Sequence, residues 1–178
     1  MLSTDCGSGV KRNVDNNAVL FIDSEQIPEK AYKGNLEIKW LHISPNVRSI
    51  GAYVFADCSN IVEIRIEEGV EHIGEYCFKN CTKLEKIYLP NTRIDIDPTV
   101  FGVKPFNWDD MENSLREWSE EPKVAPHFEG VLNIFYDGTW EEYGDFVEGH
   151  LSCSFIENTR IIYVHCKDVV LTYNKWGF

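Results

Sequence analysis

Apolar residues recur along residues 49–89 in a pattern that repeats after 23 positions. The matching pairs are Ile50-Gly51 with Ile73-Gly74, Phe55 with Phe78, Cys58 with Cys81, Ile61 with Leu84, Ile64 with Ile87, and Ile66 with Leu89. A fixed period of about 20 to 50 residues is typical of a solenoid, in which each unit buries its apolar side chains only by stacking on its neighbours. The pattern therefore predicts an array of stacked 23-residue units.

The same register continues on both sides of the clear pair. One period earlier, a degenerate first unit places apolar or small polar residues in the matching slots: Ile27, Tyr32, Asn35, Ile38, Leu41 and Ile43. One period later, the register predicts apolar residues at positions 96 and 101, where Ile96 and Phe101 stand. We therefore expect about four units, each containing a short strand with alternating inward and outward side chains.

The register breaks after Phe101 and resumes 24 residues late, with Val131, Ile134 and Tyr136 in the inward slots of the next strand. Within this insert, residues 109–119 are predicted to form a helix, because Met111, Leu115 and Trp118 have helical spacing. Its tryptophans, Trp108 and Trp118, are interpreted either as packing residues or as part of an interface. Insertions in repeat proteins often map to the binding face.

A C-terminal cap is predicted after the last repeat strand. Thr139 and Glu142 fit the capping box that begins a short helix. Residues 160–166 and 169–173 are apolar runs that predict two strands separated by Lys167-Asp168. We expect this part to close the array and not to form a second domain.

These elements predict a single domain over residues 18–178 after a flexible polar segment, residues 1–17. Residues 18–101 hold a cap strand, expected over 18–23, and the repeats; residues 102–130 form the helical insert; residues 131–178 form the last strand and the cap. The predicted fold class is an α/β solenoid, a leucine-rich-repeat-like right-handed array of about four 23-residue units with a C-terminal α/β cap.

Charge narrows the classes of partner. The chain has 17 basic and 29 acidic residues, a net charge of −12. Binding of an acidic protein to the phosphates of nucleic acid or to an anionic membrane surface is electrostatically unfavourable. Binding to a basic protein surface is favourable. No run approaches the ~20 apolar residues that cross a bilayer. We therefore expect a protein partner, no direct contact with nucleic acid and no membrane association.

The N-terminal segment and the six cysteines bear on location. Residues 1–17 contain no apolar stretch typical of a signal peptide. We therefore expect a cytoplasmic protein with reduced thiols, and secretion only if the N-terminus is a processed or artificial end. Cys58, Cys77 and Cys81 are interpreted as packing residues, because stacked turns would hold Cys58 and Cys81 ~4.8 Å apart at Cβ, too far for a disulfide.

The unit Ile-Gly-x-x-x-Phe-x-x-Cys-x-x-Ile/Leu-x-x-Ile-x-Ile/Leu resembles that of the BspA-like (Treponema-type) leucine-rich repeat family, which typically reads I-G-x-x-A-F-x-x-C-x-x-L-x-x-I-x-I-P. The resemblance covers residues 27–101 in register and the strand at 131–136. It implies a binding scaffold, often extracellular in bacteria and protists, with no shared catalytic residues. The chain departs from the family in its small number of units, its internal insert and the absence of an apparent secretion signal.

The outward positions of the strands are the candidate binding residues. Alternation places them in columns on an exposed face, expected to be concave. One column holds Trp40, Glu63 and Lys86, a second holds His42, Arg65, Tyr88 and Phe135, and a third holds Ser44 and Glu67. Aromatic residues beside arginine are typical of binding hot spots. The alternative is a solvated sheet with weak charge pairs such as Glu63 with Lys86.

No constellation in the sequence predicts catalysis or a cofactor. His150, Cys153, His165 and Cys166 could be assembled into a zinc site, but adjacent residues of a strand point to opposite faces. The acidic residues around the insert lack the spacing of a calcium loop. The sequence thus favours a non-enzymatic protein-binding module. The alternatives are a small acidic inhibitor that occludes a basic, nucleic-acid-binding surface of its target, or, with less support, a hydrolase with an unrecognised site. The oligomeric state is left open.

Overall fold

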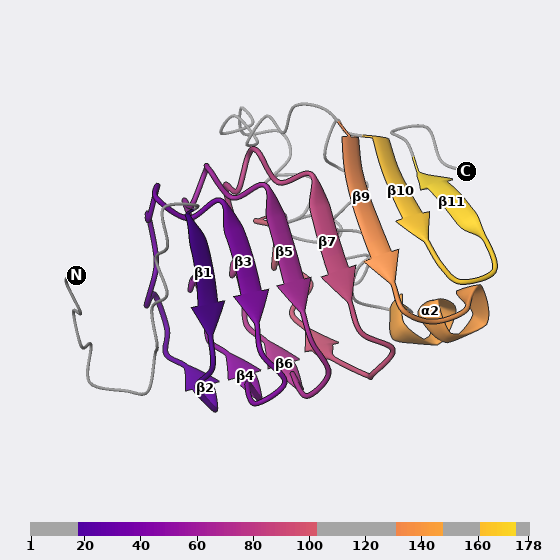
Figure 1. Cartoon of the computed structure of the whole chain (residues 1–178), viewed down its shortest axis with the longest axis horizontal. Helices are drawn as coiled ribbons and strands as arrows, with labels where there is room; N and C mark the ends of the chain where they lie inside the picture. The colour runs from indigo at the N-terminus through magenta and orange to yellow at the C-terminus, as the bar shows by residue number, and fades with distance from the viewer. Residues whose placement is uncertain (1–17, 103–130, 148–160, 174–178) are drawn as a thin grey trace, which may run out of the picture.

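The computed structural model describes residues 18–102, 131–147 and 161–173, which form a β-solenoid (Figure 1). The larger sheet has seven strands: β1 (Val19–Ile22), β3 (Trp40–Ile43), β5 (Glu63–Ile66), β7 (Lys86–Leu89), β9 (Val131–Tyr136), β10 (Ile161–His165) and β11 (Val170–Tyr173). The smaller sheet has four: β2 (Gln26–Ile27), β4 (Ser49–Ile50), β6 (His72–Ile73) and β8 (Asp95–Ile96). The regular secondary structure of the described part is almost entirely strand, and its helix is α2 (Trp140–Val147).

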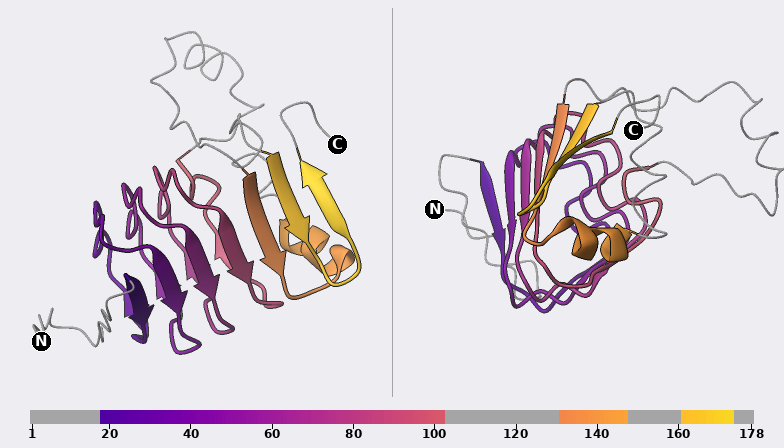
Figure 2. Two further views of the ribbon diagram at one scale, coloured as in Figure 1. Left: turned by 45° about the horizontal axis from the view of Figure 1, so that its top comes forward. Right: turned by 90° about the vertical axis from the view of Figure 1, so that its right-hand side faces the viewer.

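From β1 to β8, successive strands alternate between the two sheets, so each turn of the chain contributes one strand to each sheet. Viewed along the array, the strands of one turn lie behind those of the next and enclose the core (Figure 2). In the larger sheet, Leu41 pairs with Ile64, Ile64 with Ile87, and Ile87 with Ile134, all in parallel strands. Each of these four side chains is at most 4% exposed. The predicted solenoid and the register of its repeat are therefore confirmed, while the count of four units stays a prediction.

A stack of aromatic rings runs through the core. The centroids of Tyr32 and Phe55 are 5.5 Å apart, those of Phe55 and Phe78 are 5.7 Å apart, and those of Phe78 and Phe101 are 6.0 Å apart. These four residues occupy one slot of the 23-residue register, and Phe55 is 0% exposed. Stacked aromatic pairs contribute about 0.5–1.5 kcal/mol each beyond the area that they bury. The stack therefore couples each turn to the next.

The cysteine of each clear repeat donates a hydrogen bond to a backbone carbonyl of the preceding turn. The Cys58 thiol donates to the carbonyl oxygen of Tyr32 over 3.1 Å, and the Cys81 thiol donates to that of Phe55 over 3.4 Å. Both cysteines are 0% exposed. A small, weakly polar side chain fits this slot because it fills the interior and also reaches an acceptor on the neighbouring turn.

The glycine of the repeated Ile-Gly pair is required by close backbone approach. A Cβ on Gly51 would lie 2.8 Å from the backbone nitrogen of Glu29, and a Cβ on Gly74 would lie 2.8 Å from that of Ala52. Both distances are shorter than ordinary van der Waals contact. The motif glycine therefore lets adjacent turns pack at the corner that follows the smaller sheet.

The larger sheet continues beyond the repeat strands at both ends. The strand expected over residues 18–23 is observed as β1, which pairs in parallel with β3. At the other end, β10 pairs in parallel with β9 and in antiparallel fashion with β11. The helix predicted over residues 109–119 and the segment 1–17 lie outside the described residues. Among the described residues, no helix has the length and apolar character needed to cross a membrane.

Two predicted orientations are wrong. Val131, expected to face inward, is 38% exposed, and Leu132 takes the inner side with 4% exposed. The reason is that β9 is a continuous six-residue strand, so inward and outward side chains alternate along its whole length. Leu84, which occupies the slot of Val131 in the preceding repeat, instead lies in the turn before β7. Ser44, expected on the exposed face, is 2% exposed because its hydroxyl donates to Asp23 Oδ1 over 2.6 Å.

The predicted capping box begins α2. The Thr139 backbone N–H donates to Glu142 Oε2 over 2.7 Å, and the Glu142 N–H donates to Thr139 Oγ1 over 3.4 Å. The Trp140 N–H donates to Asp168 Oδ1 over 2.8 Å, which fastens the helix to the β10–β11 turn. In addition, the buried Tyr143 packs edge-on against Tyr136 at 5.3 Å. The short helix is therefore held by its own capping box, by the β10–β11 turn and by β9.

The capping carboxylate predicts a pH-dependent difference in stability. The hydrogen bond from the Thr139 N–H, followed by bonds from the side chains of Asn91 and Thr139, lowers the pKa of Glu142 below its ordinary value of 4.5. A lowered folded-state pKa contributes stability above the unfolded-state pKa, and this contribution is lost as the pH falls through the folded-state pKa. We expect wild type to melt at a higher temperature than Glu142→Gln at neutral pH, and the two melting curves to converge in acid. A difference that is constant with pH would contradict this assignment.

Candidate functional site

The outer face of the seven-stranded sheet collects the outward side chains in two columns. Their register follows from the strand pairing: the first column is Val19, Trp40, Glu63, Lys86, Asn133 and Tyr163, and the second is Phe21, His42, Arg65, Tyr88, Phe135 and His165. The seven residues predicted from sequence to share this face, Trp40, His42, Glu63, Arg65, Lys86, Tyr88 and Phe135, therefore lie in adjacent positions on it.

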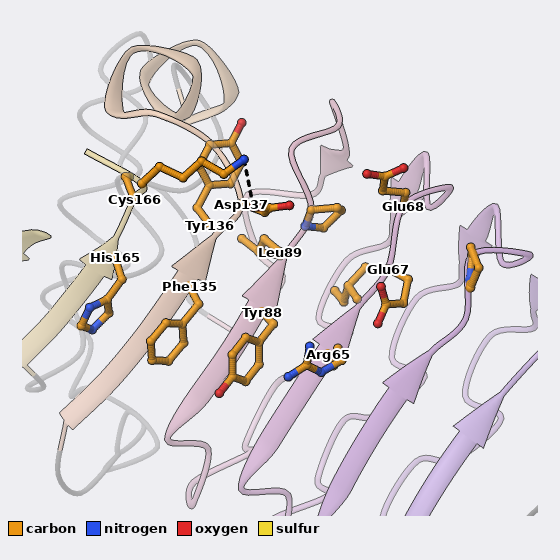
Figure 3. Close-up of a pocket in the computed structure, with 14 residues that line it drawn as sticks. Arg65, Glu67, Glu68, Tyr88, Leu89, Phe135, Tyr136, Asp137, His165 and Cys166 are labelled. Carbon is orange, nitrogen blue, oxygen red and sulfur yellow. Dashed lines mark ion pairs between the residues drawn. The ribbon is translucent and has the colours of Figure 1, made fainter. Parts of the chain in front are cut away.

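Four side chains of the second column form a continuous stack, which we call the strip: Arg65, Tyr88, Phe135 and His165 (Figure 3). The Arg65 Cζ lies 4.2 Å from the centroid of the Tyr88 ring. The ring centroids of Tyr88 and Phe135 are 4.7 Å apart, and those of Phe135 and His165 are 4.5 Å apart. The ring planes in both pairs are within 13° of parallel. Each ring thus fixes the orientation of the next.

His165 and Phe21 extend the second column beyond what the sequence predicted. His165 Nε2 lies 3.0 Å from Asn133 Oδ1, which orients the imidazole in addition to its stacking on Phe135. Phe21 contacts His42 edge-on, with centroids 5.0 Å apart. The alternation of β1 could have identified Phe21. In contrast, His165 reaches the strip only because β10 pairs with β9, which the repeat does not predict.

A groove of about 670 Å³ lies over the strip and the carboxyl ends of β5, β7, β9 and β10 (Figure 3). Its floor includes Arg65, Tyr88, Phe135 and His165, and its walls come from the loops that follow the strands: Pro45, Glu67, Glu68, Pro90, Asp137 and Lys167. The groove therefore joins conformationally fixed aromatic side chains to a charged rim.

The rim of the groove holds three carboxylates. Glu67 Oε1 lies 3.0 Å from His42 Nε2, and Asp137 Oδ1 lies 3.0 Å from Lys167 Nζ. Glu68 has no ion-pair partner within 4.0 Å in the part of the chain that the structure describes. Neither Glu67 nor Glu68 is paired with a lysine or arginine in the described residues, and we call these two residues the acidic corner beside the carboxyl end of β5.

The rest of the predicted site is only partly assembled. Trp40 is 39% exposed and stands next to Glu63 in the first column. Glu63 and Lys86 lie opposite each other in register, but they are not among the ion pairs of residues 18–102. Trp108 and Trp118 lie outside the described residues, so their part in a binding surface stays a prediction.

Catalytic and metal sites were not expected from the sequence. Within residues 18–102, 131–147 and 161–173, no three His, Cys, Asp or Glu side chains are grouped closely enough to hold a metal ion. His150 and Cys153 lie outside these ranges. His165 instead joins the strip, while Cys166 packs against the core from its edge. None of these contacts supports the hydrolase hypothesis.

The buried thiols are expected to be chemically inert. Burial raises the pKa of Cys58 to about 11 from an ordinary value of 9.0, and it also raises the pKa values of Cys77 and Cys81. The thiolate is the reactive species, so a pKa higher by two units leaves roughly a hundredfold less of it near neutral pH. Iodoacetamide at about pH 8 should therefore label these three cysteines at least roughly a hundredfold more slowly in the folded chain than in urea. Equal rates by peptide mass spectrometry would contradict the packing role.

Comparison with known proteins identifies the repeat. The family model described as "BspA type Leucine rich repeat region (6 copies)" matches residues 25–121, more than half of the chain. The solved structure described as the crystal structure of pneumococcal vaccine antigen PcpA is similar at 14% sequence identity with a TM-score of 0.38. The similarity covers 86% of this chain but 42% of PcpA, so the chain spans less than half of that structure. A search of curated proteins finds no match.

Proposed function

Because the chain belongs to the family of BspA-type leucine-rich repeats, we propose that it is a non-enzymatic protein-binding module that uses the outer face of its larger sheet. The proposed scaffold is an array of about four 23-residue units closed by a C-terminal α/β cap. The proposed contact residues are Trp40, His42, Glu63, Arg65, Lys86, Tyr88 and Phe135, with His165 added, and with Trp108 and Trp118 from the insert. Its proposed location is the cytoplasm.

The single observation that carries this proposal is the stacked strip on an open sheet face. Immobilising a side chain on binding costs about 0.5–1.5 kcal/mol. Arg65, Tyr88, Phe135 and His165 are already held by one another, so they lose little freedom when a partner covers them. Tyrosine and arginine are also the residue types enriched in binding hot spots. The strip is therefore suited to anchor a protein partner.

The test is affinity capture of partner proteins from native cell extract by the full chain and by a variant with Arg65→Glu and Tyr88→Ala. Two hot-spot changes of at least about 2 kcal/mol each should lower the recovery of a true partner by at least about tenfold. A further variant without residues 103–130 measures the contribution of Trp108 and Trp118. Unchanged recovery with the double variant would exclude this face as the binding site.

The matched control carries the same two types of substitution elsewhere, Arg93→Glu and Tyr53→Ala. Arg93 is exposed just before β8, and Tyr53 stacks on Tyr76 at the turn after β4, so neither lies on the outer face of the larger sheet. Tyr53 has φ of 57°, and alanine in its place adds no new backbone strain, because tyrosine and alanine both carry an unbranched Cβ in this left-handed conformation. We expect this control to recover the partner as wild type does.

A second candidate function is a small acidic inhibitor that occludes a basic, nucleic-acid-binding surface of its target. The observations that favour it are the net charge of −12 and the acidic corner at Glu67 and Glu68. An interaction of this kind weakens with salt because the Debye length falls from ~10 Å at 0.1 M to ~3 Å at 1 M. Competition with nucleic acid that is unchanged at high salt would contradict it.

A further inference from the structure

The shape of the groove limits what can lie in it. The strip crosses four neighbouring strands, a distance of ~14 Å at ~4.8 Å per strand. An extended peptide advances ~3.3 Å per residue, so about four or five residues span the strip. The groove is thus long enough for a short extended segment of another protein.

The floor offers ring edges and not ring faces. Tyr88 is covered on one side by Arg65 and on the other by Phe135, and Phe135 is covered on its second side by His165. Neither face of the Tyr88 or Phe135 ring is therefore left for a cation or for an inserted ring. What remains is an apolar surface of edges that suits an aliphatic or aromatic side chain lying across it.

The charges of the groove differ between its floor and its rim. Arg65 on the floor repels a cation from the strip. Lys167 and Asp137 neutralise each other as an ion pair at 3.0 Å. The acidic corner of Glu67 and Glu68 is the part of the described rim where negative charge is not balanced by a lysine or arginine within 4.0 Å. A cationic side chain is therefore favoured at that corner.

We propose that the groove binds an extended segment of a partner protein that carries a lysine or arginine two residues from an aliphatic or aromatic residue. The cation lies at Glu67 and Glu68, and the apolar side chain lies on the edges of Tyr88 and Phe135. Side chains two apart in an extended segment are ~6.7 Å apart, within reach of the rim of β5 and the floor at β7 and β9. This inference rests on the proposed protein-binding function and adds the chemistry of the partner.

The experiment titrates three capped peptides into the isotope-labelled full chain and follows backbone amide signals by NMR. The peptides read Gly-Ser-Leu-Ser-X-Ser-Gly, with X as lysine, glutamine or glutamate. We expect the lysine peptide to bind at least about fivefold more tightly than the glutamate peptide, with shifts at residues 65–68, 88 and 135. Raising the salt from 50 to 500 mM should bring the lysine peptide to the affinity of the glutamine peptide.

Glu68→Lys should reverse the order of the lysine and glutamate peptides. The matched control is Glu85→Lys, the same substitution at an exposed residue just before β7, away from the carboxyl ends of the strands, and it should preserve the order. Equal affinity for all three peptides, tighter binding of the glutamate peptide, or an equal effect of the two variants would overturn the inference.

Failure of this inference is distinguishable from failure of the proposed function. If Tyr88→Ala weakens all three peptides alike and their affinities do not differ, the groove binds segments without selecting basic ones. If no peptide binds while capture of the partner still depends on Arg65 and Tyr88, the partner chemistry is wrong and the binding face stands. If neither peptides nor partner depend on these residues, both proposals are wrong.

Discussion

Replacing Phe55 with alanine is expected to lower the free energy of unfolding by about 3–5 kcal/mol, the range measured for truncating a buried phenylalanine. Phe55 is 0% exposed, and its ring stacks on Tyr32 at 5.5 Å and on Phe78 at 5.7 Å. Its removal leaves a cavity between two turns and breaks the ring stack at both contacts. Urea denaturation followed by far-UV circular dichroism measures the change.

Phe55→Leu is the matched comparison, because leucine keeps most of the apolar volume but loses the stacked geometry. We expect this variant to lose about 1–2 kcal/mol, between wild type and Phe55→Ala. A loss below about 1 kcal/mol for Phe55→Ala would show that the ring stack does not couple the turns.

Replacing Gly74 with alanine is expected to cost about 3 kcal/mol, the upper end of the usual range for overpacking. The new Cβ would lie 2.8 Å from the Ala52 nitrogen and 2.9 Å from the Gly51 carbonyl carbon. Both contacts are backbone atoms of the preceding turn, which cannot rotate away as a flexible side chain would. The same urea titration measures this loss.

Asp97→Ala is the control for Gly74→Ala, because Asp97 occupies the same slot one turn later and already carries a Cβ. Asp97 Oδ1 accepts hydrogen bonds from the Thr99 N–H at 2.8 Å and the Thr99 hydroxyl at 2.6 Å. Losing these bonds should cost about 1 kcal/mol. If the two variants were equally destabilised, close approach of the turns would not explain the glycine of the repeat.

The core was predictable because the repeat specifies it in several places at once. Ile50, Phe55, Cys58 and Ile64 each recur 23 residues later. The structure pairs Ile50 with Ile73 and Ile64 with Ile87, stacks Phe55 on Phe78, and gives Cys58 and Cys81 equivalent hydrogen bonds to the preceding turn. Parallel stacking requires the same slot to meet its copy on the next turn, so one correct period gives the interior of the regular repeats. It does not give the inward side of β9, where Leu132 and not Val131 is buried.

The outer columns could be predicted from the same register, but the place of His165 at the end of the strip could not. Tyr88 and Phe135 could be aligned because alternation along β7 and β9 is regular. His165 joins them through the pairing of β10 with β9, which departs from the 23-residue period. Ser44 is buried and not on the exposed face, because its hydroxyl donates a hydrogen bond to a carboxylate of the preceding turn. No local sequence pattern encodes this tertiary contact. The groove likewise depends on loops that follow the strands.

The central claim is that a partner covers the outer face of the larger sheet. Its most direct test is hydroxyl-radical footprinting of the full chain, alone and with the captured partner, read by mass spectrometry of oxidised side chains. We predict that the partner protects Trp40, Tyr88 and Phe135, while Tyr53 and Tyr76 are oxidised at unchanged rates. Protection of Tyr53 and Tyr76 with no change at Tyr88 and Phe135 would contradict the claim.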